Sequence, residues 1–298
     1  AQKQLTVELP VKRRINESAV CAGEETESFI IFSGSGFRYT FSKDLGTFVS
    51  MIKNGTEQLL APMRITAMRA PIDNERNIKS KWYWHNIWEG ENLDRQFEMV
   101  YSCARENSSV AVSGALAGVS RTPFFRYTVR YTVFCDGEIA VSLQGKVKED
   151  CIWLPRLGFE FRTPYEIDKF RYFGMGPYEN YCDMHYASMT DFYESDADME
   201  YVDYVVPQEH GNHTEVKLLS MKNGLEFKAE NVMEINVSHY TFRQLYMTKH
   251  KDELQKDSAT NIRIDYKNSG IGSASCGPPL AEKYRLNEKD ICFSFSIR

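Results

Sequence analysis

FRYTVRYTVFCDGEIAVSL, residues 125–143, is the stretch that decides the fold class. Over Phe125–Phe134 nearly every second residue is apolar or aromatic, which is the period of a strand that buries one face. Asp136-Gly137 follows, a pair that accepts the positive φ values of a tight hairpin turn. The alternation resumes over Ile139–Leu143. The stretch therefore predicts two antiparallel strands joined by a short turn.

The same signal recurs along the chain. Aromatic residues alternate over Phe37–Phe41, and Asn54-Gly55 turns the chain after the next apolar run. Asn223-Gly224 separates the apolar runs Val216–Met221 and Leu225–Lys228. Such pairs favour two-residue hairpins, so their recurrence predicts antiparallel sheet through most of the chain.

Helical signals are few. Ser238–His250 predicts one short helix with Phe242, Leu245 and Tyr246 on one face. Ser80–Trp88, rich in Trp and Tyr, is interpreted as an ordered loop. We therefore expect an all-β protein with few short helices, folded sheet on sheet as one large domain.

Composition narrows the class of partner. Of 298 residues 42% are hydrophobic, and the net charge of −5 comes from interspersed residues rather than blocks, so nucleic acid is not an expected partner. No apolar run approaches the ~20 residues that span a bilayer, so a membrane is not an expected partner either.

The seven cysteines are odd in number, and no two of them form a C-x-x-C pair. This pattern predicts no zinc motif and favours a reduced, cytoplasmic chain with mostly buried thiols.

Two polar stretches have the composition of a ligand site. FGMGPYENYCDMHYAS, residues 173–188, combines the aromatic rings and the amide, carboxyl and imidazole groups that sugars contact. A loop that buries its Tyr rings over the sheet is the alternative. PQEHGNHTEV, residues 207–216, places polar groups around Gly211, and we interpret it as a polar cluster at a strand end. His210 and His213 are three apart, but no third spaced metal ligand accompanies them.

Two further stretches have simple structural interpretations. RAPIDNERN, residues 69–77, contains neighbouring carboxylates, yet glycoside hydrolysis needs two carboxyls facing each other ~5–9.5 Å apart across the scissile bond. An Asx-turn is the simpler interpretation. NSGIGSASCGPP, residues 268–279, follows no strand–helix phosphate-binding pattern, and nothing beside Cys276 would activate it as a nucleophile.

In this order and spacing the segments resemble the C-terminal domain of the β-galactosidases of glycoside hydrolase family two. Residues 69–74 match the family's R-A-P-x-D-N, and residues 176–183 match its G-P-x-E-N-Y-x-D. Residues 204–211 match its Y-x-x-P-x-E-x-G, and residues 270–278 match its final loop. The resemblance covers roughly residues 28–298.

The resemblance implies a fold and a domain boundary. Residues 25–298 would form an antiparallel β-supersandwich of the galactose mutarotase type. Residues 1–24 would be the end of a preceding immunoglobulin-like domain or a linker, since the charged stretch Arg13–Ser28 is the plausible boundary. In the family both catalytic glutamates of a retaining hydrolysis lie in a preceding barrel. No catalytic residue, metal or cofactor is then expected in this chain, although intact family enzymes often bind Mg²⁺ or Na⁺ elsewhere.

The resemblance also implies site residues and partners. The residues expected at the substrate rim or in sugar binding are Asp73, Asn74, Glu179, Asn180, Glu209, His210 and Cys276. Cys276 stands where family members carry a Trp platform, and Met184 replaces a basic residue. The expected partners are galactosides, the preceding domains and further copies of the enzyme.

Two other functions stay open. In a free-standing aldose 1-epimerase, Glu209 with His185 or His210 would supply the base and the acid of ring opening. In a non-catalytic carbohydrate-binding module, exposed rings such as Tyr178, Tyr181, Trp82 or Trp84 would stack on a glycan.

Overall fold

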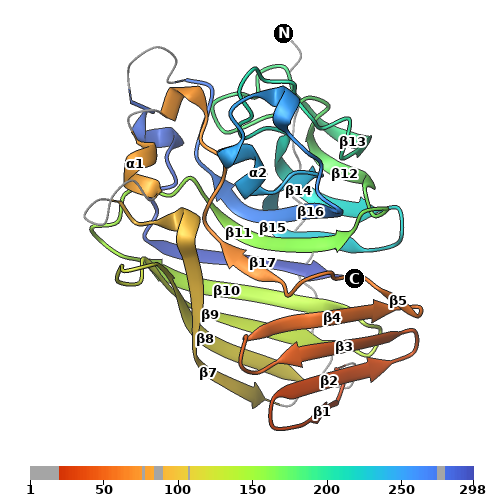
Figure 1. Ribbon diagram of the computed structural model, residues 1–298. Coiled ribbons are helices and arrows are strands. Elements are labelled where there is room, and N and C mark those ends of the chain that lie inside the picture. The colour runs from red at the N-terminus through yellow and green to blue at the C-terminus, as the bar shows by residue number, and fades with distance from the viewer. Residues whose placement is uncertain (1–19, 76–77, 84–89, 107, 274–278) are drawn as a thin grey trace.

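The computed structural model describes residues 20–75, 78–83, 90–106, 108–273 and 279–298, in which most regular structure is β (Figure 1). The strands are β1 (Gly23–Glu25), β2 (Phe29–Gly34), β3 (Phe37–Ser42), β4 (Thr47–Lys53), β5 (Thr56–Glu57), β6 (Arg64–Thr66), β7 (Gln96–Glu106), β8 (Ser109–Gly118), β9 (Phe125–Val133), β10 (Ile139–Val147), β11 (Arg156–Pro164), β12 (Lys169–Gly176), β13 (Met189–Asp196), β14 (Asn212–Met221), β15 (Glu226–Ser238), β16 (Ala259–Asn268) and β17 (Asp290–Ile297). The helices are α1 (Lys79–Trp82), α2 (Phe242–Met247) and the single 3₁₀ turns η2 (Asp73–Glu75), η3 (Leu93–Arg95), η4 (Lys251–Glu253) and η5 (Glu282–Tyr284).

The strands form two antiparallel sheets, which confirms the predicted all-β class (Figure 1). A five-stranded sheet has the order β1-β2-β3-β4-β5. A twelve-stranded sheet runs β13-β12-β14-β15-β17-β10-β9-β8-β7, and β16 pairs with β15, β11 with β16, and β6 with β11. The long β15 therefore carries both branches of the larger sheet.

The β9–β10 hairpin is the one predicted from residues 125–143. Buried and exposed side chains alternate along β9, and Tyr131 packs edge-to-face against Phe41 and Phe48 at ring-centroid distances of 5.3 and 5.5 Å. These rings belong to the five-stranded sheet, so the period of two places one face of the larger sheet against the smaller one. Each such aromatic pair stabilises by ~0.5–1.5 kcal/mol beyond its buried area.

The three predicted hairpins exist, but their turns differ from the expectation. Asn54 and Gly55 both have positive φ, 48° and 80°, and join Lys53 directly to Thr56 in a two-residue turn. At the other two turns only the glycine is left-handed, Gly137 at 81° and Gly224 at 90°. The prediction of two-residue loops is wrong there, because the strands end earlier and the turns are longer.

A helix within the predicted range is confirmed as α2, but it covers Phe242–Met247 rather than Ser238–His250, because Ser238 is the last residue of β15. It begins after Thr241, whose side chain accepts a hydrogen bond from the Gln244 backbone N–H while the Gln244 side chain reciprocates, which is a capping box. Leu245 is buried. Phe242 and Tyr246, on the same face, both pack against Tyr83 at 5.5 and 5.3 Å.

The loop interpretation of residues 80–88 is wrong in part. Lys79–Trp82 forms the single turn α1, and residues 84–89 lie outside the described residues. No side chain caps α1, but the Trp82 indole is fully buried. We attribute the helical turn to this burial, which sequence propensity does not reveal.

The first described residues pair with the five-stranded and twelve-stranded sheets. Val20 bridges Phe134 and Gly23–Glu25 pairs with β2, so residues 20–24 already belong to the sandwich. The sequence assigned these residues to the preceding segment. Residues 1–19 lie outside the described residues, so the boundary itself stays a prediction.

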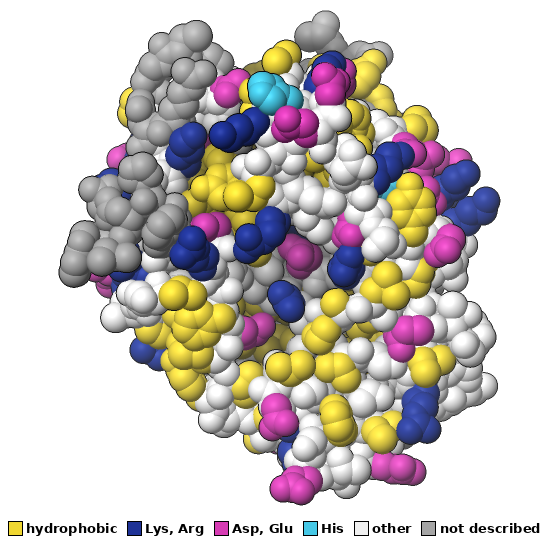
Figure 2. All heavy atoms as spheres, in the orientation of Figure 1, with side chains coloured by type: hydrophobic (Ala, Val, Ile, Leu, Met, Phe, Trp, Pro, Cys, Tyr) yellow, Lys and Arg dark blue, Asp and Glu magenta, His cyan; other side chains and the backbone are white. Residues whose placement is uncertain are grey.

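The surface charges and the thiols can also be compared with the expectations from the sequence. On the face in Figure 2, charged side chains of both signs are interspersed. Among the described residues, the helices are too short to span a bilayer.

Six cysteines are described, and no disulfide joins them. Of these only Cys21 and Cys151 are buried, so the expectation of mostly buried thiols is wrong for this part of the chain.

One branch of the larger sheet has an apolar face and a polar face. In β16, Ile262 and Ile264 point into the apolar core, whereas the alternate residues Arg263 and Asp265 are buried polar groups. Neighbouring β15 continues the polar face with Glu234, Asn236 and Ser238. A buried polar face needs partners for its charges and hydrogen bonds, and these come from the loops over it.

Candidate functional site

Segments far apart in the sequence meet in a small apolar cluster. Ile72, Tyr181 and Ile271 form a buried cluster of their own, with Met184 packed against it. Each of the three comes from a different motif, residues 69–74, 176–183 and 270–278. The structure therefore brings these motifs together at one place.

Asp183 fixes the final motif at that place. Its Oδ1 accepts from the Ile271 N–H at 2.9 Å. Its Oδ2 accepts from the N–H of Gly272 and Ser273 at 3.0 and 2.9 Å and from the Ser273 hydroxyl at 2.7 Å. A Cβ on Gly270 would lie 2.5 Å from the Asp183 carboxyl carbon, so the close approach requires glycine.

Asp73 and Asn74 join the first motif to two of the others. The Asn74 side-chain amide donates to the Ile271 carbonyl at 3.2 Å. The Asp73 backbone N–H donates to the Gln208 side-chain oxygen at 3.3 Å. Asp73 itself is exposed and Asn74 half-buried, so both lie at the surface end of the motif cluster.

Glu179 holds the second motif to the third. Its carboxylate accepts from the Tyr204 hydroxyl at 2.7 Å and from the Gly211 N–H at 2.8 Å. One oxygen serves each partner, which makes Glu179 a brace between residues 176–183 and 204–211. Its predicted role at a sugar rim stays a prediction.

Asn180 is fully buried. Its amide nitrogen donates to the carbonyls of Met175 and Tyr178, both at 2.9 Å. Its amide oxygen accepts from the Thr214 N–H at 2.8 Å and hydroxyl at 2.6 Å. Both ends of the side chain are thus engaged within the protein, and a direct contact to sugar stays a prediction.

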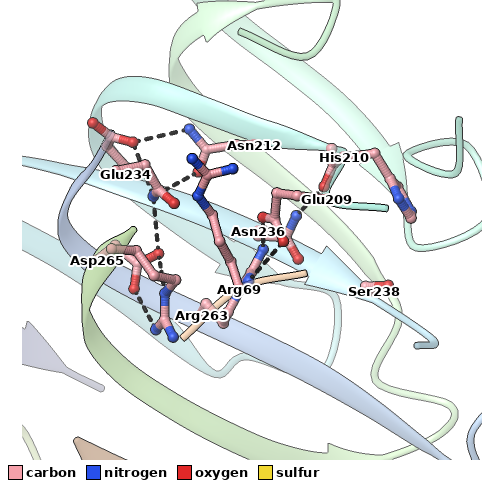
Figure 3. A network of polar contacts seen from close by, with 12 residues as sticks. Arg69, Glu209, His210, Asn212, Glu234, Asn236, Ser238, Arg263 and Asp265 are labelled. Atoms are coloured by element: carbon pink, nitrogen blue, oxygen red, sulfur yellow. Dashed lines mark hydrogen bonds and ion pairs between the residues drawn. The ribbon is translucent and has the colours of Figure 1, made fainter. Parts of the chain in front are cut away.

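Three buried ion pairs lie on the polar face and in the loops over it, and Figure 3 labels Arg69, Glu209, Arg263 and Asp265 among their members. They are Arg69–Glu75 at 2.6 Å, Arg263–Glu209, and the two-pronged Arg156–Asp265 at 2.9 and 2.6 Å. Removing charges from water is costly, so each pair is stable only with both partners present. Glu209 is 1% exposed and held by Arg263. It is therefore built into the protein, and its predicted sugar contact stays a prediction.

Glu234 is a further buried carboxylate on this face (Figure 3). Its Oε2 accepts from the side-chain amides of Asn212 and Asn268 at 2.9 and 3.0 Å. Burial raises the pKa of Glu234 to about 7, although the Asn212 hydrogen bond opposes this, and the negative charge of Asp265 adds to it. Glu234 is therefore partly protonated near neutral pH.

The two histidines of residues 207–216 have different partners. The His210 Nδ1 lies 2.8 Å from the Gln208 carbonyl, while His213 contacts the Tyr172 hydroxyl at 3.0 Å and Glu200 at 2.8 Å. Among the described residues no group of three His, Cys, Asp or Glu side chains could hold a metal ion.

Glu209 and His210 line a small cavity of about 20 Å³. This volume has room for one water molecule.

A larger cavity lies beside the motif cluster. Its volume of about 380 Å³ falls within the range of small-molecule sites. It is lined by the motif residues Ile72, Asn74, Gly270 and Ile271, by Glu75, and by Trp153 and Arg285. Of the predicted site residues, Asn74 lines this cavity, whereas Cys276 lies outside the described residues.

The sequence did not reveal the roles of some residues of this region. Asp183 lies in the second motif, and its role depends on a loop 88–90 positions away. Trp153 and Arg285 lie outside all the motifs, and nothing in their neighbouring sequence marks them. An isolated bridge between their neighbours Leu154 and Leu286 brings them together, and only the structure reveals it.

Comparison with known proteins places these features in a family. A family model described as "Beta galactosidase small chain" matches residues 33–297. The β-galactosidase of Actinobacillus pleuropneumoniae is 33% identical over 261 residues, which are 88% of this chain and 26% of that protein. That of Staphylococcus xylosus is 30% identical over 278 residues, 92% of this chain and 28% of that protein. The chain thus spans little more than a quarter of these relatives.

Solved structures of low sequence identity are also similar to the chain. A galactose 1-epimerase from Lactobacillus acidophilus is 10% identical with a TM-score of 0.46, covering 91% of this chain and 93% of that one. An aldose epimerase homologue from C. elegans is 13% identical with a TM-score of 0.47, covering 93% of this chain and 98% of that one. A likeness of this degree supports no conclusion about fold type or activity. Because the family model matches most of its length, the chain belongs to the beta galactosidase small chain family.

Proposed function

We propose that this chain works as the C-terminal part of a β-galactosidase, an enzyme that hydrolyses terminal non-reducing β-D-galactose residues of sugars such as lactose. Its part is to wall and brace the sugar site. The retaining chemistry belongs to two glutamates of a barrel domain that precedes it. The family membership supports the proposal, as does the fraction of each relative that the chain matches.

The interlocking of the motifs around the 380 Å³ cavity is the observation that carries the proposal. Asp183 holds the loop at 270–273, Asn74 is hydrogen-bonded to Ile271, and the same loops line the cavity. A wall held by so many internal contacts keeps its shape when substrate binds. Positioning of this kind lowers the barrier of a reaction whose bond-breaking groups lie elsewhere.

The carboxylates of the motif cluster also favour a bracing role. Glycoside hydrolysis needs two carboxyl groups that face each other across the scissile bond. Glu75 lines the cavity, but its carboxylate is bound by the Arg69 guanidinium and the Ile72 N–H. The Asp183 carboxylate accepts four hydrogen bonds from one loop. Neither carboxylate has the freedom of a nucleophile or an acid.

The remaining expectations are part of the same proposal. Asp73, Asn74 and Cys276 would contact the substrate at the rim, with Glu179, Asn180, Glu209 and His210 holding the loops behind them. The partners would be galactosides, the preceding domains and further copies of the enzyme. Any Mg²⁺ or Na⁺ would bind in those other domains, and the enzyme would work in the reducing cytoplasm.

Release of nitrophenol from a nitrophenyl β-galactoside tests the proposal. The polypeptide of full gene length should hydrolyse it, whereas the 298-residue chain alone should match the buffer. Hydrolysis by the chain alone that is lost in E75Q or D183N would overturn the proposal. Polarimetry on fresh α-galactose is the companion test, since ring opening faster than in buffer would favour an epimerase.

A further inference from the structure

Three buried polar atoms where the motifs meet have no hydrogen-bond partner among the described residues. They are Arg69 Nη1, the Tyr181 hydroxyl and Asn268 Oδ1, and each of the three residues is at most 1% exposed. Arg69 opens the first motif, Tyr181 lies in the second, and Asn268 ends β16 just before the final loop. Buried polar atoms in folded proteins are paired with protein groups or with ordered water.

The three side chains belong to one small region of the interior. Arg69 Nη2 donates to the carbonyl of Ser269 at 3.3 Å, which is the residue after Asn268. Cys182, the residue after Tyr181, places its Sγ 3.9 Å from the Asn268 carbonyl. Burial raises the pKa of the Tyr181 hydroxyl well above its usual value, and the nearby Arg69 charge opposes this rise. The segments that carry the three atoms are therefore in mutual contact.

The other contacts of Arg69 and Asn268 fix how these side chains are turned. Arg69 Nη2 donates to Glu75 at 2.6 Å, and its Nε donates to a backbone carbonyl at 3.1 Å. The Asn268 amide nitrogen donates to the carboxylates of Glu234 and Asp265 at 3.0 and 3.1 Å. Because a carboxylate only accepts, the amide cannot be reversed, and its oxygen is held on the side away from both acids.

The charges around the Tyr181 hydroxyl indicate what class of ligand fits. Arg69 and Arg263 are opposed there by Glu209 and Glu179, so no excess positive charge favours an anion. The Arg69 guanidinium disfavours a cation. The ligand has to accept from a guanidinium, donate to an amide oxygen and exchange a hydrogen bond with a hydroxyl. Water does all three, and buried waters in proteins have about three such partners.

We propose that an internal water molecule binds at this junction. It accepts from Arg69 Nη1, donates to Asn268 Oδ1 and is hydrogen-bonded to the Tyr181 hydroxyl. One molecule then joins the first two motifs to the end of β16. A buried water with several partners is part of the structure and costly to remove. The inference does not depend on the proposed function, because it concerns only the interior of this chain.

The sign of the effect of Y181F tests the proposal, because this variant keeps the ring and removes only the hydroxyl. A hydroxyl that is buried without a partner destabilises the protein, so its removal would raise the thermal midpoint. Since the water pairs it, we expect the midpoint to fall by about 2–4 °C, the shift for one lost hydrogen bond in a domain of this size. Y186F is the matched control, because Tyr186 is 91% exposed, and it should leave the midpoint unchanged.

A crystal structure that shows ordered water is the direct test and does not require Y181F to fold. We expect one water within about 2.7–3.2 Å of both Arg69 Nη1 and the Tyr181 hydroxyl. A Tyr181 hydroxyl bonded directly to a protein atom, or no water beside Arg69 Nη1, would overturn the proposal. So would a midpoint of Y181F that is unchanged or higher. None of these measurements uses hydrolysis of a galactoside, so failure of the proposed function would leave their outcome unaffected.

Discussion

Among single residues, the buried charges of the polar face and of the loops over it depend most strongly on their partners. Three arginines oppose four carboxylates there, namely Arg69, Arg156 and Arg263 against Glu75, Glu209, Glu234 and Asp265. The charge without a counter-ion falls on Glu234, whose partners are amides. This imbalance makes the face sensitive both to substitution and to pH.

Loss of one member of the Arg156–Asp265 pair should be strongly destabilising. Both side chains are fully buried, so R156M leaves an uncompensated carboxylate, and we expect the free energy of unfolding to fall by ~3–5 kcal/mol in urea. The double variant R156M/D265L removes both charges and should recover much of that loss. R130M at the exposed Arg130–Glu106 pair is the control and should cost under ~1 kcal/mol. An R156M loss no larger than that control would contradict the role of the pair.

Glu234 should make stability depend on pH. Its pKa rises from 4.5 to about 7 in the folded protein because of burial. The folded state therefore keeps a proton that the unfolded chain loses, and unfolding becomes easier as the pH rises through this window, by on the order of 2–3 kcal/mol. E234Q removes this titration. Urea midpoints at about pH 5 and about pH 7.5 should differ more in wild type than in E234Q. Glu98 has a similarly raised pKa, but it is present in both wild type and E234Q, so its contribution to the midpoint shift is the same in both proteins. Equal midpoint differences in wild type and E234Q would contradict the assignment of this pH dependence to Glu234.

Among the elements, the short helix α2 depends on its cap. Its six residues are too few to be stable by propensity alone. The capping box of Thr241 and Gln244 should therefore contribute to the stability of α2. We expect T241A to lower the free energy of unfolding by ~1 kcal/mol and T241S to retain most of it. Differential urea melts measure both. Equal stability of T241A and wild type would show that packing of Leu245 suffices.

The position of the loop at 270–273 depends on the Asp183 carboxylate, which accepts hydrogen bonds from its backbone. D183A removes the acceptor of three consecutive N–H groups, so the loop that lines the cavity should lose its fixed position. In the full-length enzyme we expect KM for lactose to rise about fivefold with a smaller change in kcat, as for lost uniform binding. D183N keeps one acceptor oxygen and should lie between. An unchanged KM in D183A, with the thermal midpoint also unchanged, would contradict the anchoring role.

The elements also show how far the sequence alone reaches. Local patterns such as Asp136-Gly137 and the apolar face of Phe242, Leu245 and Tyr246 act over a few residues, so the hairpins and α2 could be predicted from them. The turn lengths at Gly137 and Gly224 could not, because the pairing of the strands decides where each turn begins. The short helix at Lys79–Trp82 was missed because burial of Trp82, rather than propensity, holds it.

The candidate site was less accessible from the sequence. Residues 69–74, 176–183, 204–211 and 270–278 could be recognised by their order, but not their mutual contacts. Glu179 and Asn180 have a sugar-site composition, yet in the structure they are hydrogen-bonded to Tyr204, Gly211 and Thr214. Composition cannot distinguish a side chain that contacts ligand from one that braces a loop, because both need the same polar groups.

On the scale of the whole molecule, two sheets form a sandwich whose polar branch carries the interlocked loops (Figure 1). The apolar core is continuous through both sheets, so the chain has the core of an independent domain. Its cavity opens beside the loops rather than within the core. Such a domain can act as a rigid wall against which another domain completes a site.

Complementation is the measurement that tests the central claim most directly. The 298-residue chain and the remaining part of the same enzyme are purified separately, and nitrophenol release from a nitrophenyl β-galactoside is followed for each alone and for the mixture. The account predicts no hydrolysis by the chain, weak or no hydrolysis by the other part, and activity in the mixture that D183A reduces. Hydrolysis by the chain alone, abolished by substitution of one of its own carboxylates, would contradict it.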